Sequence, residues 1–237
     1  MTKRISVAMA TYNGAVFLEE QLLSLFRQTV LPHELWVTDD GSTDSTLAIL
    51  EKFSVGAPFP VHVCANPQRL GYGRNFLKAA SLCTAEYVAF CDQDDVWRAD
   101  KLQRVTKVIE QMSPDIVVHS GIVVDHALEI LGDRYPDIQS PRWLEPAQLY
   151  EDFFWPGYAL VMKRDTLISW GMNEVVADDK RCPNTFAHDR WVFDAAKGGA
   201  KCYQIPDDLV QYRQHASNLI GFGGIVKEFT ISVTKFG

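Results

Sequence analysis

Three carboxylates lie within four consecutive residues, Asp92-Gln93-Asp94-Asp95. The apolar run Tyr87-Val88-Ala89-Phe90 precedes them and predicts a buried strand, so the carboxylates emerge together at the carboxyl end of that strand. Neighbouring carboxylates repel one another. A hard divalent cation, Mg²⁺ or Mn²⁺, resolves this repulsion by binding one or two of them and filling its other positions with phosphate oxygens and water. The alternative is a helix N-terminus, with Asp95 as its cap and Asp100 in its first turn.

Two further polar clusters follow predicted strands in the same way. Thr11-Tyr12-Asn13-Gly14 comes after the apolar run Ile5–Ala10, and Asp39-Asp40-Gly41-Ser42-Thr43-Asp44 comes at the end of Leu35–Thr38. Each cluster alone is compatible with a simple turn or with the start of a helix. Because the carboxyl ends of parallel strands meet at one edge of a sheet, three such clusters favour a shared ligand site.

The elements that position these clusters alternate between strand and helix in the first half of the chain. Helices are predicted for 15–28, 43–53 and 72–83, between strands at 5–10, 35–38, 61–65 and 87–91. This rhythm predicts an α/β fold with a mostly parallel, Rossmann-like sheet and helices on both faces.

The second half is less regular. Strands are predicted for 116–124, 158–162 and 209–212, and helices for 102–112 and 187–196. Residues 133–148 contain three prolines and are predicted to form a long loop, which is usually functional in a compact domain. We therefore divide the chain into a first half at 1–97, a second half at 98–220 and an amphipathic tail at 221–237.

Composition limits the classes of partner and compartment. The 237 residues are 47% hydrophobic and carry a net charge of −7, which argues against nucleic acid as the main partner. Five cysteines without a C-x-x-C pair predict a reducing cytoplasm and no disulfide framework. The chain begins directly with a strand and has no run of 18 apolar residues, so neither a signal peptide nor a membrane-spanning helix is expected.

With this layout, residues 4–220 resemble a family 2 glycosyltransferase of the GT-A fold. Ala10–Gly14 is similar to the opening strand and nucleotide loop of that family, Asp39–Ser42 to its base-recognising element, and Asp92–Asp95 to its D-x-D metal motif. Gln211-Tyr212-Arg213-Gln214-His215 falls where a metal- or diphosphate-contacting element is found. Together with Asp-Gln-Asp-Asp-x-Trp, this segment is most similar to bacterial rhamnosyltransferases of surface-polysaccharide assembly.

The resemblance implies that 1–97 is a donor half, with a site for a nucleoside-diphosphate sugar, and that 98–220 is an acceptor half. Asp40 would accept a hydrogen bond from the N3–H of a pyrimidine, which favours dTDP or UDP. Asp92 would face the ribose, Asp94 would ligate Mg²⁺ or Mn²⁺, and His215 would complete the metal shell or bind the diphosphate. Other donor contacts are expected from Thr11, Tyr12, Asn13, Arg69, Gly71 and Arg213, although Arg69 is equally compatible with an ordinary solvated loop residue.

The resemblance also implies a catalytic carboxylate at His188-Asp189. Transfer with inversion needs one base to deprotonate the acceptor hydroxyl, and Asp189 is the expected base. His188 would orient it or is simply buried. An acceptor platform is expected from Trp155, Gly157, Tyr158 and Trp191, although large aromatic residues more often lie in the core.

The sequence thus predicts an inverting, metal-dependent glycosyltransferase that extends a glycan or lipid-linked glycan in the cytoplasm, with peripheral contact to the inner face of the plasma membrane. Two alternatives stay open. A sugar-nucleotide pyrophosphorylase usually opens with a basic Gly-rich loop, whereas Thr11–Gly14 has no lysine or arginine. A non-catalytic sugar-binding module would not need a second acidic residue such as Asp189.

Overall fold

The computed structural model describes residues 3–145, 149, 155–177 and 186–215. Its first half is the predicted α/β unit. Strands β1 (Ile5–Thr11), β2 (Leu35–Asp39), β3 (Val61–Ala65) and β4 (Tyr87–Cys91) are parallel and lie in the order β3-β2-β1-β4. Helices α1 (Ala15–Phe26), α2 (Thr46–Gly56) and α3 (Tyr72–Leu82) connect them.

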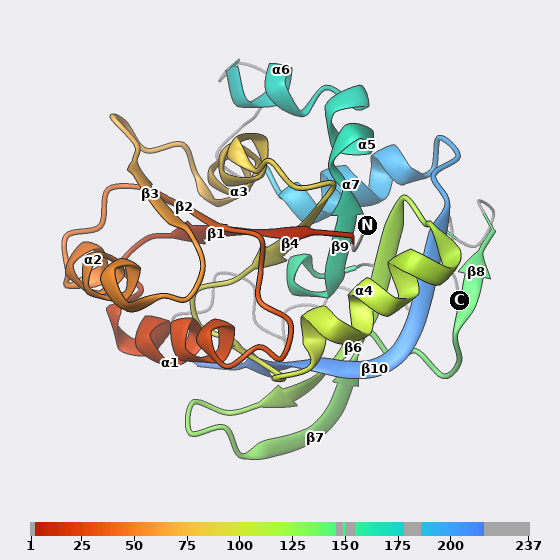
Figure 1. Ribbon diagram of the computed structural model, residues 1–237, viewed down its shortest axis with the longest axis horizontal. Coiled ribbons are helices and arrows are strands. Elements are labelled where there is room, and N and C mark those ends of the chain that lie inside the picture. Colours follow the sequence, from red (N-terminus) through yellow and green to blue (C-terminus); the bar gives the residue numbers. More distant parts are fainter. Residues whose placement is uncertain (1–2, 146–148, 150–154, 178–185, 216–237) are drawn as a thin grey trace, which may run out of the picture.

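Burial explains why these strands are apolar throughout. Every residue of β1 and of β4 is buried, because helices cover the sheet on both sides. Helix α1 turns Leu18, Leu22 and Leu25 inward, at the spacing that places residues on one face of a helix. Helices α1 and α2 lie together on one side of the strands, and α3 lies on the other with α6 (Met172–Ala177) (Figure 1).

The second half extends the same sheet. Its strands are β5 (Val96–Trp97), β6 (Ile116–Val124), β9 (Leu160–Lys163) and β10 (Cys202–Arg213), and the full order is β3-β2-β1-β4-β9-β6-β10-β5. Strand β9 is antiparallel to both β4 and β6, whereas β10 is parallel to β6. The predicted α/β fold, with a mostly parallel sheet and helices on both faces, is confirmed. The remaining elements are α4 (Lys101–Met112), the 3₁₀ turn η2 (Gly157–Ala159), α5 (Arg164–Ser169) and α7 (His188–Ala196).

Two predictions about the second half, and the alternative given for Asp95, were wrong. Residues 133–148 are not one long loop, since β7 (Ile130–Tyr135) pairs with β6 and β8 (Arg142–Leu144) pairs with β10. Both strands are largely exposed and therefore lack an apolar pattern. Strand β10 has 12 residues rather than four, with register shifts on either side of Asp208. Asp95 does not cap a helix, because a short strand follows it and α4 begins only at Lys101.

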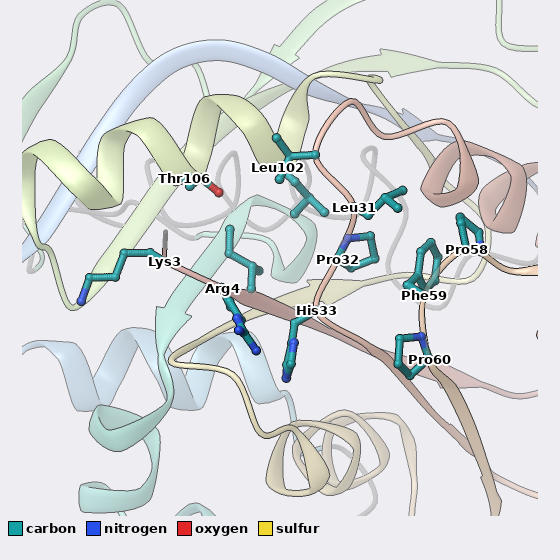
Figure 2. Close-up of a pocket in the computed structure, with 12 residues that line it drawn as sticks. Lys3, Arg4, Leu31, Pro32, His33, Pro58, Phe59, Pro60, Leu102 and Thr106 are labelled. Carbon is teal, nitrogen blue, oxygen red and sulfur yellow. The ribbon is translucent and has the colours of Figure 1, made fainter. Parts of the chain in front are cut away.

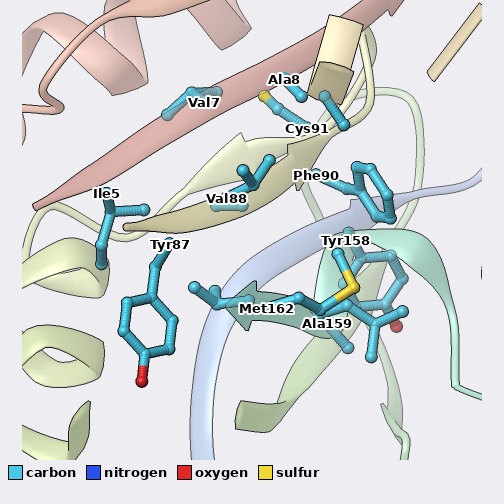
Figure 3. Close-up of a cluster of buried hydrophobic side chains, with 14 of the residues drawn as sticks. Ile5, Val7, Ala8, Tyr87, Val88, Phe90, Cys91, Tyr158, Ala159 and Met162 are labelled. Carbon is cyan, nitrogen blue, oxygen red and sulfur yellow. The ribbon is translucent and has the colours of Figure 1, made fainter. Parts of the chain in front are cut away.

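The core is continuous across the two halves. Figure 3 shows Ile5, Val7 and Ala8 of β1 beside Tyr87, Val88, Phe90 and Cys91 of β4, with Tyr158, Ala159 and Met162 against them. Of the helices that the structure describes, none has both the length and the apolar character needed to cross a bilayer.

Candidate active site

The carboxyl ends of β1, β2 and β4 bring the three polar clusters together, as predicted. The first two clusters lock to each other through side chains. Asp39 is fully buried and accepts hydrogen bonds from Thr11 Oγ1 at 2.7 Å and from the Ser42 backbone N at 2.8 Å. The backbone N–H of Asn13 donates to Ser42 Oγ at 2.9 Å, and the N–H of Thr43 donates to Asn13 Oδ1 at 2.8 Å. Asp39 thus organises the loop, a role that the sequence did not reveal.

Asp40 shapes the loop at 66–71. Its carboxylate is 4% exposed and accepts from Asn66 Nδ2 at 3.0 Å, from the Leu70 N–H at 2.7 Å and from the Gly71 N–H at 2.9 Å. Gly71 has φ +82°, a backbone conformation that favours glycine. The close backbone approach that was predicted at Gly71 is therefore made to the Asp40 carboxylate. Direct contact of Asp40 with a base stays a prediction.

Tyr12 and Arg69 stack beside this loop. The Arg69 guanidinium lies 3.8 Å from the centre of the Tyr12 ring, which is 38% exposed, and its Nε lies 3.8 Å from Asp40 Oδ2. Arg69 therefore contacts Tyr12 and Asp40, although its side chain is 63% exposed, so its role as a donor contact stays a prediction. A planar base and a guanidinium both pack well on aromatic faces. The partly exposed Tyr12 ring is therefore a candidate contact for a nucleotide base.

Gln93 joins the acidic loop to the first cluster. The Tyr12 N–H donates to Gln93 Oε1 at 3.0 Å, and Gln93 Nε2 donates to the Tyr12 carbonyl at 3.1 Å. A Cβ at Gly14 would lie 2.2 Å from Gln93 Oε1, so only glycine permits this approach. The sequence singled out the carboxylates on either side of Gln93 and missed this link.

The acidic loop meets the end of β10. Asp94 Oδ2 lies 2.9 Å from His215 Nε2, and their side chains are 21% and 11% exposed. The His215 ring also packs on Phe17, with ring centres 4.6 Å apart. Asp95 is fully buried and accepts from the Arg213 N–H at 2.9 Å. The fold therefore places Asp94 beside His215, and their role as metal ligands stays a prediction.

Arg213 is a brace for this loop, which corrects its prediction as a donor contact. The residue is 2% exposed, and its guanidinium donates to the Asp94 carbonyl and the His126 carbonyl, both at 2.7 Å, and to the Glu20 carboxylate. These bonds tie the acidic loop to α1 and to the β6–β7 connection. Arg213 therefore helps to fix the positions of Asp94 and His215.

Asp189 lies in the first turn of α7 and is 7% exposed. Burial raises the pKa of its carboxyl from 3.8 to about 6, although it accepts hydrogen bonds from the Arg190 and Gly157 N–H groups. The charge of Asp189 acts on Asp92: burial first, then the charges of Asp94 and Asp189, raise the pKa of Asp92. Asp189 and the acidic loop thus share one electrostatic environment.

His188 is buried beside Asp189. Its ring stacks on Phe76 with centres 4.1 Å apart and meets Phe90 edge-on at 4.7 Å. Burial lowers the pKa of His188 to about 3, so its imidazole is neutral. Gly157 lies against it, since a Cβ there would be 2.5 Å from His188 Nε2. Of the two alternatives for His188, this favours a buried residue.

The expected acceptor platform is wrong for two of its members. Trp155 and Tyr158 are each 1% exposed. Trp155 packs edge-on against Phe193, and Tyr158 packs on Tyr212 and lies in the core shown in Figure 3. Large rings gain more by full burial than by lining a wet cleft. Trp191 is half-buried, packs against the core and meets Trp170 edge-on, so its role in acceptor binding stays a prediction.

The side chains of Asp94 and His215 fit a divalent cation that also binds a diphosphate. In the described part of the chain, no three His, Cys, Asp or Glu side chains form a complete metal cage. Mg²⁺ seldom needs one, because it binds through one or two carboxylates and keeps phosphate oxygens and water. Asp94 and His215 offer an adjacent oxygen and nitrogen that are partly open to solvent.

A separate hollow of about 320 Å³ lies at the other end of the strands (Figure 2). Lys3, Arg4 and His33 contribute to it, together with Pro58, Phe59 and Pro60. These segments precede β1, β2 and β3, so the hollow faces the amino edge of the sheet and takes no part in the site described above.

Comparisons with known proteins agree with this arrangement. The family model described as "Glycosyl transferase family 2" matches residues 6–157. The chain is 28% identical over 222 residues to the dTDP-rhamnosyl transferase RfbG of Shigella flexneri, covering 90% of the chain and 73% of that protein. It is 25% identical over 211 residues to the putative teichuronic acid biosynthesis glycosyltransferase TuaG of Bacillus subtilis, covering 79% and 82%.

Solved structures show the same fold. S. aureus TarS 1–349 in complex with UDP-GlcNAc superposes with a TM-score of 0.73 and 21% identity, covering 91% of this chain and 60% of that one. The mannosyltransferase PcManGT of Pyrobaculum calidifontis, in complex with GDP-Man and Mn²⁺, superposes with a TM-score of 0.66 and 17% identity, covering 99% and 65%. The chain thus spans less than two thirds of each of these structures. With a family model matched over more than half of its length and a GT-A fold, the chain belongs to glycosyl transferase family 2.

Proposed function

We propose that this protein is an inverting, metal-dependent glycosyltransferase that uses a nucleoside-diphosphate sugar. The observation that carries the proposal is the arrangement of two acidic sites at one sheet edge. Asp94 pairs with His215 on one side, and Asp189, with its raised pKa, acts electrostatically on Asp92 on the other. A metal–diphosphate site that faces a poised base is what sugar transfer from such a donor requires.

On this proposal, the donor lies over the carboxyl ends of β1, β2 and β4. Tyr12 and Arg69 flank the base, Thr11 and Asn13 hold the first loop in place, and Asp92 faces the ribose. Asp94 and His215 hold Mg²⁺ or Mn²⁺. When bound, that cation supplies Lewis-acid neutralisation of the charge that grows on the leaving diphosphate.

Asp189 then serves as the general base. Its carboxylate accepts the proton of the acceptor hydroxyl while the hydroxyl oxygen attacks the anomeric carbon. The bond between that carbon and the diphosphate oxygen breaks on the opposite face, so the configuration inverts. The buried position of Asp189 excludes most water, and its pKa of about 6 keeps it ionised yet basic near neutral pH.

A thermal-shift series tests this donor chemistry. Nucleotide sugars with dTDP, UDP, GDP and ADP are compared with and without Mg²⁺ or Mn²⁺. A donor at one hundred times its dissociation constant should stabilise the protein by about 2.7 kcal/mol. Stabilisation that needs both a nucleotide sugar and a metal supports the proposal, whereas the absence of a shift with every pair contradicts it.

We expect a pyrimidine nucleotide, dTDP or UDP, with rhamnose as the sugar. The name of RfbG includes a dTDP-rhamnosyl donor, and TarS was crystallised with UDP-GlcNAc. Calorimetry in Mg²⁺ should therefore give dTDP or UDP at least about tenfold tighter binding than GDP or ADP, which corresponds to about 1.4 kcal/mol. Tighter binding of GDP would overturn the assignment.

Activity should depend on pH through Asp189. Protonated Asp189 cannot accept the acceptor proton, so kcat/KM should fall as pH drops below about 6 and should reach a plateau above about 7. Initial rates between pH 5 and 8, at saturating donor and metal, measure this fall at low pH. A profile that is flat down to pH 5 would show that a different group, with a lower pKa, is the base.

The acceptor is proposed to be a glycan or lipid-linked glycan of a bacterial surface polysaccharide. The name of TuaG, which includes teichuronic acid biosynthesis, supports a glycan acceptor. The corresponding location is the cytoplasm at the inner face of the plasma membrane. The described residues do not include the tail at 221–237. They also do not include Asp178 and Asp179, two carboxylates that precede α7 in the sequence.

A further inference from the structure

A lysine side chain is enclosed in the core between the two acidic sites. Lys101, the first residue of α4, is fully buried. Its Nζ donates a hydrogen bond to the Tyr158 carbonyl at 2.9 Å and lies 3.8 Å from the centre of the Trp97 ring. A buried ammonium is expensive to desolvate, and an apolar residue of similar length would usually stabilise the fold as well or better. Stability alone therefore does not explain a lysine at this position.

One side of Lys101 lies against the strand that follows the acidic loop. Its Nζ is 3.8 Å from the centre of the Trp97 ring, and Trp97 belongs to β5, the next element after Asp95. Strand β5 pairs with β10 through Trp97 and Val210. Lys101 thus packs on the segment that joins the acidic loop to β10, the strand that leads to His215.

The other side of Lys101 holds the turn that supports the base. Tyr158 lies at the centre of η2, between Gly157 and Ala159. The Gly157 N–H donates to the Asp189 carboxylate, and its Cα abuts the ring of His188. A shift of η2 would therefore move a hydrogen bond of Asp189 and the packing of the residue before it.

We infer that Lys101 is a positioning residue that fixes the acidic loop and the η2 turn relative to each other, and so sets the geometry between Asp94 and Asp189. The inference rests on the proposed function, since it assigns Lys101 to the alignment of the donor's leaving group with the base. Lys101 itself touches neither substrate.

The test compares Lys101→Met with Lys107→Met. Lys107 is an exposed lysine on the same helix and serves as the matched control. Unfolding temperature, the dissociation constant of Mg²⁺–dTDP and turnover of dTDP-rhamnose are measured for each. Because an error of about 1 Å in a reacting geometry can cost about 100-fold, Lys101→Met should lose about 30- to 100-fold in kcat. Its nucleotide affinity should stay within about threefold of the control.

A second variant, Lys101→Arg, keeps the cation and its donors and should recover at least about threefold of the lost kcat. Turnover of Lys101→Met within about threefold of Lys107→Met would overturn the inference. So would a parallel loss of kcat, nucleotide affinity and unfolding temperature, which is the pattern of a merely structural residue. If the wild type and Lys107→Met bind nucleotide but release no dTDP from the donor, the proposed function fails as well, and the two failures are thereby distinguished.

Discussion

Asp189→Asn should abolish most turnover while leaving the donor site intact. Asn keeps the size and polarity of the side chain but cannot accept a proton from the attacking hydroxyl. Turnover should therefore fall by roughly 10²–10⁴, the usual contribution of a general base, with donor affinity within about threefold of wild type. Steady-state rates and calorimetry with donor and Mg²⁺ measure the two quantities.

Stability separates this result from misfolding. The folded-state pKa of Asp189, about 6, lies above its ordinary value of 3.8, so folding loses stability as pH rises through 6. A shift of about two units corresponds to on the order of 3 kcal/mol at pH 8. Asn avoids this penalty, so Asp189→Asn should unfold at pH 8 no earlier than wild type. A variant that retains more than about a tenth of wild-type turnover would rule Asp189 out as the base, and Glu174 of α6 would be tested next.

The control for Asp189→Asn is Asp194→Asn. Asp194 lies on the same helix, is exposed, and pairs with Arg190 and Lys197. Surface pairs of this kind contribute about 0–1 kcal/mol. Asp194→Asn should therefore keep turnover within about twofold of wild type, which separates a missing base from a general loss of charge on α7.

Asp94→Asn should act on binding and chemistry together. The substitution removes the charged oxygen beside His215 Nε2, so the pair loses its strongest ligand for a divalent cation. In Mg²⁺, nucleotide affinity should fall at least about tenfold, and turnover should fall by roughly 10²–10³, because several kcal/mol of leaving-group stabilisation are lost. Calorimetry of dTDP in Mg²⁺ and in EDTA measures the binding effect.

The measurement in EDTA discriminates between two explanations for the loss of nucleotide affinity. If Asp94 acts through the cation, wild type and Asp94→Asn should bind dTDP equally in EDTA. A loss of affinity that persists in EDTA would instead point to a collapsed acidic loop and would contradict the role of Asp94 as a metal ligand.

The sequence predicted the donor half well because its signals are local. Each of β1 to β4 is a short apolar run with a polar residue close to its carboxyl end, and parallel topology gathers those ends without further information. A shared metal site for Asp94 and His215, 121 residues apart, was predicted only because the motifs resembled a family. Spacing alone gave no sign of it.

The acceptor half was predicted less well because its features depend on contacts between distant segments. Strand β7 is exposed, so no apolar alternation marks it, and β10 is interrupted by its register shifts. Arg213 had the charge of a donor ligand, but its partners at Glu20, Asp94 and His126 made it a brace. Likewise, burial of Trp155 and Tyr158 is set by the packing of α7 and β10, which no local pattern encodes.

The most direct measurement follows the fate of a doubly labelled donor. The protein is incubated with dTDP-rhamnose labelled in the sugar and in the nucleotide, with Mg²⁺ and an extract of bacterial lipid-linked glycans. Our account predicts that nucleotide label appears as dTDP, that sugar label enters the glycan, and that both steps stop in EDTA and in Asp189→Asn. Two results would contradict it: nucleotide label recovered as dTTP when pyrophosphate is added, as a pyrophosphorylase would give, or tight donor binding with no product in any arm.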